Sequence, residues 1–268
     1  YQIAVTATDS NSQTTALANA SKYLIAKDTT APDAGNVAKI YFDKGWYNAS
    51  ENSITFTPSS AITDAGVSVP GSVPSIQSPS VEWRFMVGNG GWNAWTSADS
   101  SATIAIPSSV ADSNAVPITV QLRDDFANTT ADLACPTIPR DTTIPVVTSI
   151  DIEGIKYGDK TMVGSSTVNV TVIGTDNLSG VAQYSLSGTP TPGSFIAYNP
   201  GATNTGSVMI STEEGDHPVY VWVQDAAGNI SSVDTADTVV DTKDPVVNKF
   251  FVRTTAFTST DDNLTAEG

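Results

Sequence analysis

The sequence predicts an all-β chain in which β-sandwich modules follow one another in tandem. Three observations support this prediction: short alternating stretches of β-branched and aromatic residues, turn residues between those stretches, and internal repeats. The clearest predicted strands span residues 118–122, 168–172, 219–223 and 250–252. Regularly spaced short strands of this kind are typical of a sandwich.

Boundary motifs divide the chain. An Asp-Thr-Thr-x-Pro motif begins at Asp28 and again at Asp141, and the related Asp-Thr-Lys-Asp-Pro begins at Asp241. The copies lie roughly a hundred residues apart, which is the size of one immunoglobulin-like sandwich. A proline at the fifth position of each motif fixes the backbone φ angle and favours a stiff boundary.

Two further elements keep their place relative to each boundary. Loops starting at Asp9, Asp124 and Asp225 precede the three boundaries, each between two alternating stretches, and we expect each to be the turn of a closing hairpin. Turns containing Asp64 and Asp176 follow the first two boundaries at nearly equal distances. We therefore expect a partial module at 1–28, complete modules at 29–141 and 142–241, and the start of another at 242–268. Alternatively, the partial ends complement each other between subunits by strand addition.

Composition excludes several function classes. The 268 residues include 28 acidic and 12 basic side chains, a net charge of −16, which disfavours nucleic-acid binding. No apolar run is long enough to span a membrane. The single cysteine, Cys135, excludes an internal disulfide and is predicted to be a small buried side chain. His217 is the only histidine and is predicted to be incidental. Because no histidine is then available to activate Cys135 as a nucleophile, we expect no catalytic site.

The boundary motifs and the turns starting at Asp176 and Asp225 resemble the bacterial and archaeal immunoglobulin-like repeats of large cell-surface proteins, of adhesin or S-layer type. The resemblance implies tandem immunoglobulin-like β-sandwich modules, two complete with partial modules at both ends. It also implies an extracellular, cell-surface location, a structural role as stalk or lattice, and neighbouring copies or modules as partners. The first module departs from the pattern by a Pro/Ser-rich insertion at 67–80, predicted to be a projecting loop.

Aspartates at the boundaries and turns predict ion sites. In this topology the first strand starts at the end that carries the B–C and F–G loops, so one boundary and two turn aspartates should converge in each module. Close carboxylates repel unless a cation lies among them, and oxygen ligands from turns suit Ca²⁺. The predicted calcium ligands are Asp28, Asp64 and Asp124 in the first module and Asp141, Asp176 and Asp225 in the second. The alternative is that these aspartates only cap turns.

Tryptophans concentrate in the first module. Residues 81–87 and 92–95 predict a hairpin in which Trp83 and Phe85 face the core, as Trp222 does in the second module. Trp92 and Trp95 are then the surface candidates for stacking on a glycan or binding a host receptor. Two alternative functions follow: a carbohydrate- or receptor-binding module that uses these aromatics and the 67–80 loop, or a non-catalytic spacer of a secreted enzyme.

Asn-x-Ser/Thr sequences mark candidate glycosylation sites, which would suit a glycosylated surface protein. The candidates are Asn19, Asn48, Asn128, Asn177, Asn229 and Asn263, and a further match, Asn169, lies within a predicted strand.

Overall fold

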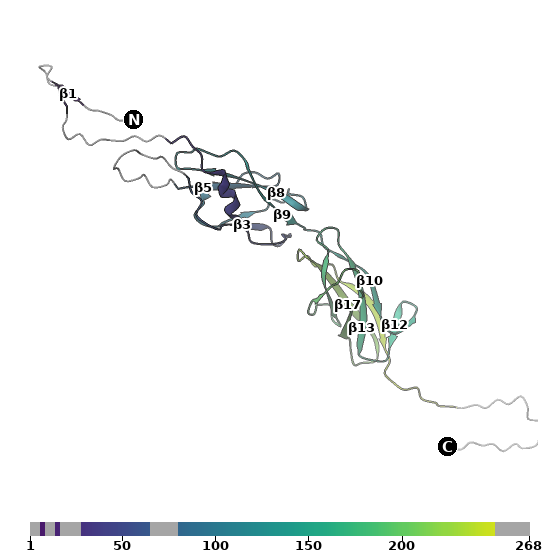
Figure 1. Ribbon diagram of the computed structural model, residues 1–268. Coiled ribbons are helices and arrows are strands. Elements are labelled where there is room, and N and C mark those ends of the chain that lie inside the picture. The colour runs from purple at the N-terminus through teal and green to yellow at the C-terminus, as the bar shows by residue number, and fades with distance from the viewer. Residues whose placement is uncertain (1–5, 9–13, 17–27, 65–79, 250–268) are drawn as a thin grey trace, which may run out of the picture.

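Figure 1 shows the computed structural model, which describes residues 6–8, 14–16, 28–64 and 80–249. The described part is almost entirely β-structure and forms two sandwiches arranged end to end, so the all-β prediction is confirmed. The predicted strand at 250–252, Asn19, Asn263 and nearly all of the 67–80 insertion lie outside the described residues.

The first sandwich consists of two antiparallel sheets. One has the order β3 (Ile40–Phe42), β4 (Ser53–Pro58), β7 (Ala102–Ala105), and the short 3₁₀ helix η1 (Ala34–Lys39) precedes it. The other has the order β6 (Thr96–Ser97), β5 (Glu82–Val87), β8 (Ser113–Arg123), β9 (Leu133–Arg140). Trp83 and Phe85 are buried as predicted, and the Phe85 ring stacks on Phe56 of the facing sheet at 3.8 Å between centroids.

The second sandwich repeats this plan with longer strands. Its smaller sheet has the order β10 (Val146–Ile152), β13 (Thr167–Thr175), β16 (Asn204–Met209). Its larger sheet has the order β11 (Ile155–Tyr157), β12 (Lys160–Val163), β18 (Asp234–Val240), β17 (Gly215–Asp225), β14 (Val181–Ser187), β15 (Ile196–Ala197). Valines at alternate positions of β13 and β17 contribute six of the fourteen buried residues of the core, as expected for strands buried on one face.

The predicted closing hairpins are present. β8 pairs with β9 and β17 with β18, both antiparallel, and β1 (Thr6–Thr8) pairs with β2 (Thr14–Ala16) in the same way. The loops 124–128 and 225–229 are called the first and second F–G loops below. Because β9 ends at Arg140 and β10 starts at Val146, only residues 141–145 connect the two sandwiches.

The prediction for residues 92–95 was wrong in detail. The strand that pairs with β5 is Thr96–Ser97, and residues 92–95 form no strand. Asn93 explains the difference, because its side-chain oxygen accepts from the Phe85 N–H at 2.5 Å while its own N–H donates to the Phe85 carbonyl at 3.1 Å. One asparagine thus satisfies both backbone groups that a paired strand would otherwise satisfy.

Trp222 is buried, but not in the core cluster of the second sandwich. Its neighbours Val221 and Val223 point into the core, so alternation places Trp222 on the outer face of the larger sheet. There its ring stacks on Tyr220 at 6.4 Å between centroids.

Candidate metal centres

Six aspartates form two clusters, one at the end of each sandwich where its first strand begins. The first cluster is Asp28, Asp64 and Asp124, and the second is Asp141, Asp176 and Asp225. In each cluster one carboxylate oxygen from every member lies within 4.8 Å of the others. The convergence predicted from the repeats is therefore present, with the same three residues in each module.

Asp141 is the linker member of the second cluster. It directly follows β9, is fully buried, and its N–H donates to the Tyr47 carbonyl at 2.9 Å, which attaches it to the first sandwich. Its two carboxylate oxygens accept from the N–H groups of Thr143 at 3.0 Å and Ser179 at 2.9 Å. These bonds fix the carboxylate while leaving lone pairs on both oxygens.

Asp176 comes from the turn after β13. One of its oxygens, Oδ2, accepts from the N–H groups of Leu178 at 3.0 Å and Gly180 at 2.8 Å. Gly180 closes this turn with φ of 80°, a left-handed conformation that favours glycine. The other oxygen, Oδ1, is buried and accepts no hydrogen bond. A buried carboxylate oxygen with no donor is costly unless a cation binds it.

Asp225 ends β17 and opens the second F–G loop. Asn229 donates to both of its oxygens at 2.8 Å, through its backbone N–H and its side-chain Nδ2. Desolvation raises the pKa of the Asp225 carboxyl; the Asn229 hydrogen bonds oppose this rise, and the charges of Asp141 and Asp176 add to it. The buried site thus disfavours a third negative charge when no cation balances it.

The first cluster repeats this chemistry. Asp28 Oδ1 accepts from the Thr30 N–H at 3.0 Å and the Thr30 hydroxyl at 2.8 Å, while its Oδ2 is buried without a hydrogen bond. Asp124 accepts from the Asn128 N–H at 2.9 Å and the Asn128 Nδ2 at 2.7 Å. Asp64 completes the cluster and is also buried.

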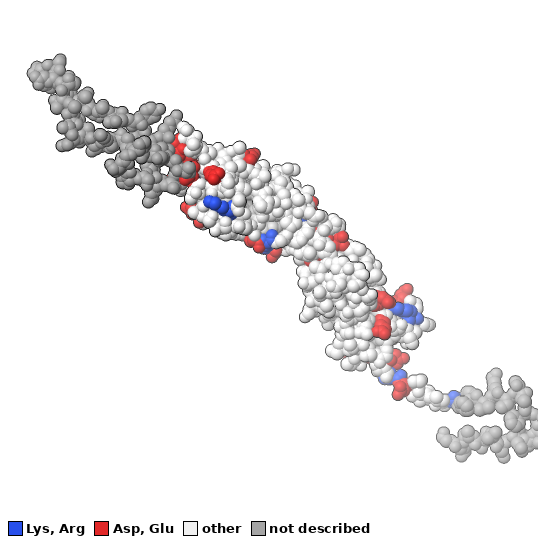
Figure 2. Space-filling view, viewed as in Figure 1, with Lys and Arg blue, Asp and Glu red and all other residues white. Residues whose placement is uncertain are grey.

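Charge balance at the clusters is incomplete within the protein. In the described part of the chain, no Lys or Arg forms a salt bridge with any of the six aspartates. Figure 2 shows few basic side chains on the viewed face, consistent with the net charge of −16. Both clusters offer oxygen ligands only, from turns and a linker, and a hard divalent cation fits such a donor set.

A second contact holds the linkers that start at Asp141 and Asp241, and the repeat motifs did not predict it. The Thr142 N–H and hydroxyl donate to Asp112 Oδ2 at 2.9 and 2.8 Å, and Arg140 pairs with Asp112 Oδ1 at 2.8 Å. At the next boundary the Thr242 hydroxyl donates to Glu214 at 2.5 Å. The two acceptors are different residue types outside any repeated motif, so only the repeated Thr after the boundary aspartate could have indicated them.

Trp92 and Trp95 are half-buried, and cations of the same chain lie over their rings. The Arg84 guanidinium lies 4.7 Å from the Trp92 centroid and 4.6 Å from that of Trp95, and Arg123 lies 4.5 Å from the Trp95 centroid. A sugar ring stacking on Trp95 would have to compete with these guanidinium groups.

The candidate glycosylation asparagines differ in environment. Asn48 and Asn229 are buried, and Asn229 donates both side-chain hydrogens, to Asp225 and to the Asp141 carbonyl. Asn128 is half-buried and donates to its cluster aspartate, whereas Asn177 is exposed. A glycan replaces one Nδ2 hydrogen, so it would break a bond at Asn229, and Asn177 is the better placed acceptor.

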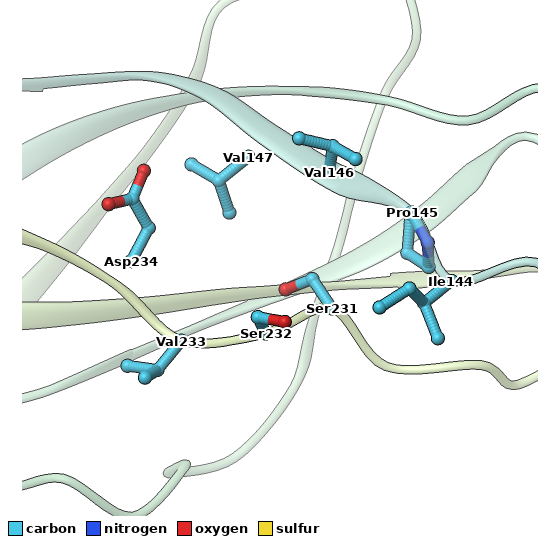
Figure 3. Close-up of a pocket in the computed structure, with 8 residues that line it drawn as sticks. All are labelled: Ile144, Pro145, Val146, Val147, Ser231, Ser232, Val233 and Asp234. Atoms are coloured by element: carbon cyan, nitrogen blue, oxygen red, sulfur yellow. The ribbon is translucent and has the colours of Figure 1, made fainter.

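The remaining candidates carry no reactive arrangement. Cys135 is buried, as predicted, and burial raises the pKa of its thiol to about 12. His217 Nε2 lies 2.9 Å from the Glu213 carbonyl. A groove of about 210 Å³ lies beside the linker. Figure 3 shows its lining, which consists mainly of apolar side chains such as Ile144, Val147 and Val233. This groove does not include the aspartates of either cluster.

Comparisons with known proteins concern the fold alone. The sequence matches no protein-family model and no curated protein. Among solved structures, the fibronectin(III)-like modules of Clostridium thermocellum CbhA match at 13% identity, covering 75% of this chain and 93% of that chain, with a TM-score of 0.39. A 1.5-MDa bacterial ice-binding adhesin matches at 18% identity, covering 80% of this chain and 67% of that one, with a TM-score of 0.40.

A Ca²⁺-stabilized adhesin of an Antarctic bacterium that binds ice matches at 18% identity and a TM-score of 0.42. The match covers 89% of this chain but only 56% of that adhesin chain. Within the described residues no helix has the length and apolar character needed to cross a membrane. The described part of the chain thus contains two β-sandwiches in tandem, each built from a smaller and a larger sheet.

Proposed function

We propose that this segment is a stalk or lattice component of an extracellular cell-surface protein, of adhesin or S-layer type, and that Ca²⁺ at the module boundaries stiffens it. The observation that carries the proposal is the convergence, in each cluster, of one linker carboxylate with two loop carboxylates. The role is mechanical and involves no catalysis. The partners are neighbouring modules or copies of the same surface protein.

Electrostatics supports a bound cation. Three carboxylates within 4.8 Å of one another repel strongly when they are shielded from water. Turn capping explains only part of the arrangement, because Asp28 Oδ2 and Asp176 Oδ1 are buried and cap nothing. A divalent cation would supply the missing partner for these oxygens and reduce the repulsion.

The donor set favours Ca²⁺ over other metals. Calcium accepts six to eight oxygen ligands at about 2.3–2.6 Å in flexible geometry, and backbone carbonyls and water would complete its shell. Magnesium requires a near-ideal octahedron, which a linker and two loops seldom provide. Zinc prefers His and Cys, and neither cluster contains one.

The stiffening follows from where Asp141 is attached. Its backbone is bonded to Tyr47 and the adjacent Thr142 is bonded to Asp112, so Asp141 moves with the first sandwich. Asp176 and Asp225 belong to loops of the second sandwich. A cation that binds all three carboxylates therefore links the two sandwiches across a linker of five residues, and it restricts their relative motion.

Calcium titration with matched variants tests the proposal. Isothermal calorimetry should find two calcium ions per chain, with one site lost in Asp64→Asn and the other in Asp176→Asn. Asp99→Asn changes an exposed aspartate outside both clusters and should retain both sites. Calcium at a hundred times Kd should add about 2.7 kcal/mol per site to the free energy of unfolding. It should also raise the melting midpoint by several degrees. Identical melts in calcium and in chelator would refute the ion-binding role.

A further inference from the structure

Asn48 connects the two sandwiches directly. It follows Tyr47 at the end of the first sandwich that meets the second sandwich. Its Nδ2 donates to the carbonyl of Ala227 at 2.6 Å. Ala227 lies 179 residues further along the chain, in the second F–G loop. Asn48 is buried with only 5% of its surface exposed, so water competes poorly for this bond.

Local bonds orient the Asn48 amide. Its Oδ1 accepts from the Ser50 N–H at 3.0 Å, the Ser50 hydroxyl at 2.9 Å and the Glu51 N–H at 2.8 Å. Because three donors point at Oδ1, this terminal atom of the amide must be the oxygen. The nitrogen, Nδ2, is then directed across the boundary. The side chain is therefore pre-organised as a donor before the second sandwich reaches it.

The loop that Asn48 contacts is also the loop that carries a candidate ligand. Ala227 lies two residues after Asp225, and Gly228 follows it with φ of 91°. A Cβ atom on Gly228 would lie 3.2 Å from Asn48 Nδ2, so the backbone approaches the amide closely. Asn48 and the Asp225–Asn229 hydrogen bonds thus hold opposite sides of one short loop.

We infer that Asn48 is a positioning residue that fixes the second F–G loop against the first sandwich, and thereby sets both the angle of the boundary and the calcium affinity of the second cluster. The angle depends on the Asn48 bond with or without an ion. The effect on affinity rests on the proposed function, and it follows because a loop already held in its binding geometry pays less ordering cost when it binds.

An internal comparison shows that the boundary at Asp241 has no equivalent of the Asn48 side chain. The Asp141 N–H donates to the Tyr47 carbonyl and the Asp241 N–H donates to the Val163 carbonyl, so Val163 is the equivalent of Tyr47. The residue equivalent to Asn48 is therefore Gly164, which has no side chain to donate. The sequence alone places Asn48 in a glycosylation motif and gives no sign of this role.

Distance measurements in chelator test the role at the boundary. Spin labels at Ala115→Cys and Ala202→Cys, exposed positions in different sandwiches, report the inter-sandwich distance by pulsed electron resonance. We expect a narrow distribution in the otherwise native chain and in the exposed control Asn114→Ala, and a broad one in Asn48→Ala. Asn48→Asp keeps the local acceptor and loses the donor. A folded Asn48→Asp protein should therefore also show a broad distance distribution. Superimposable distributions for all four proteins would overturn the inference.

Calorimetry tests the coupling. Asn48→Ala in the Asp64→Asn background, where only the second cluster is intact, should weaken calcium binding about threefold to tenfold, the equivalent of one net hydrogen bond. In the Asp176→Asn background, where only the first cluster is intact, affinity should not change. Equal loss in both backgrounds would overturn the coupling. Failure of every variant to bind calcium would contradict the proposed function and the coupling, and the chelator distances would still decide the positional role.

Discussion

The side-chain amide of Asn229 donates to the backbone carbonyl of Asp141 at 3.0 Å, across 88 residues of sequence. The same amide donates to Asp225 Oδ2 at 2.8 Å, so one asparagine joins the linker to the second F–G loop. This bond and the carboxylate cluster hold the same two segments together. The linker is thus attached to the second sandwich by neutral hydrogen bonds as well as by any bound ion.

Asn229→Ala should therefore destabilise the second sandwich even in chelator. Two buried acceptors lose their donor, which costs about 2 kcal/mol in the free energy of unfolding. Asn128→Ala, the equivalent change in the first sandwich, should cost less, because Asn128 is less buried and its amide donates only to Asp124 among the described residues. Urea unfolding of both variants checks the order, and a larger loss in Asn128→Ala would contradict this explanation.

Asp112→Ala should destabilise the protein through Arg140. That guanidinium is largely buried and pairs with Asp112 at 2.8 Å, so removing the carboxylate leaves a buried positive charge. Breaking such a pair costs about 3 kcal/mol, and Thr142 loses its acceptor as well. Asp216→Ala, which breaks an exposed pair with Lys160, is the control and should cost less than about 1 kcal/mol by the same urea measurement.

The sequence predicted the six aspartates because two independent patterns agree on them. The repeats give nearly equal spacings for the boundary and turn residues, and sandwich topology places the first strand and both loops at one end. Each aspartate also sits beside a short turn motif that a local pattern can detect, as at Asp176 and Asp225. Topology and local turn chemistry suffice for a site built from strand ends.

Contacts between side chains of different elements could not be predicted in this way. The bond from Asn48 to Ala227 depends on how two sandwiches meet, and no periodicity within either sandwich encodes that. The Asn93 bonds to Phe85 replaced the expected strand for a related reason, since a side chain satisfied backbone groups that the alternation pattern assigns to a partner strand. Burial of Trp222 on the outer face likewise depends on tertiary contacts, which alternation along one strand does not predict.

Tyr47→Phe should make part of the stability independent of pH. The Tyr47 hydroxyl donates to Asp43 at 2.6 Å. Desolvation acts to raise the pKa of Asp43, but the hydrogen bonds from Tyr47 and the Thr55 N–H outweigh it, and the pKa falls below its usual 3.8. A lowered folded-state pKa contributes stability that is present above pH 3.8 and is lost as pH falls through the folded-state value.

The difference in unfolding free energy between the native chain and Tyr47→Phe should therefore be constant between pH 6 and 8 and shrink below about pH 4. Tyr41→Phe changes an exposed tyrosine of the same sandwich and should show no such trend. Urea titrations at several pH values measure it. A difference that grows as pH falls would show that the sign assigned to the Asp43 bond is wrong.

Cys135 should report opening of the first sandwich and its response to calcium. It is the only cysteine, it is buried, and burial raises the pKa of its thiol to about 12, so the folded protein presents almost no thiolate at pH 8. Modification by a thiol reagent then requires opening of the sandwich, and ligand binding to the folded state suppresses opening.

Calcium should therefore slow the labelling in the native chain and in Asp176→Asn, which retains the first cluster. In Asp64→Asn the same calcium concentration should leave the labelling rate close to that in chelator. Equal protection of the thiol in both variants would show that the ion does not act through the cluster of the sandwich that contains Cys135.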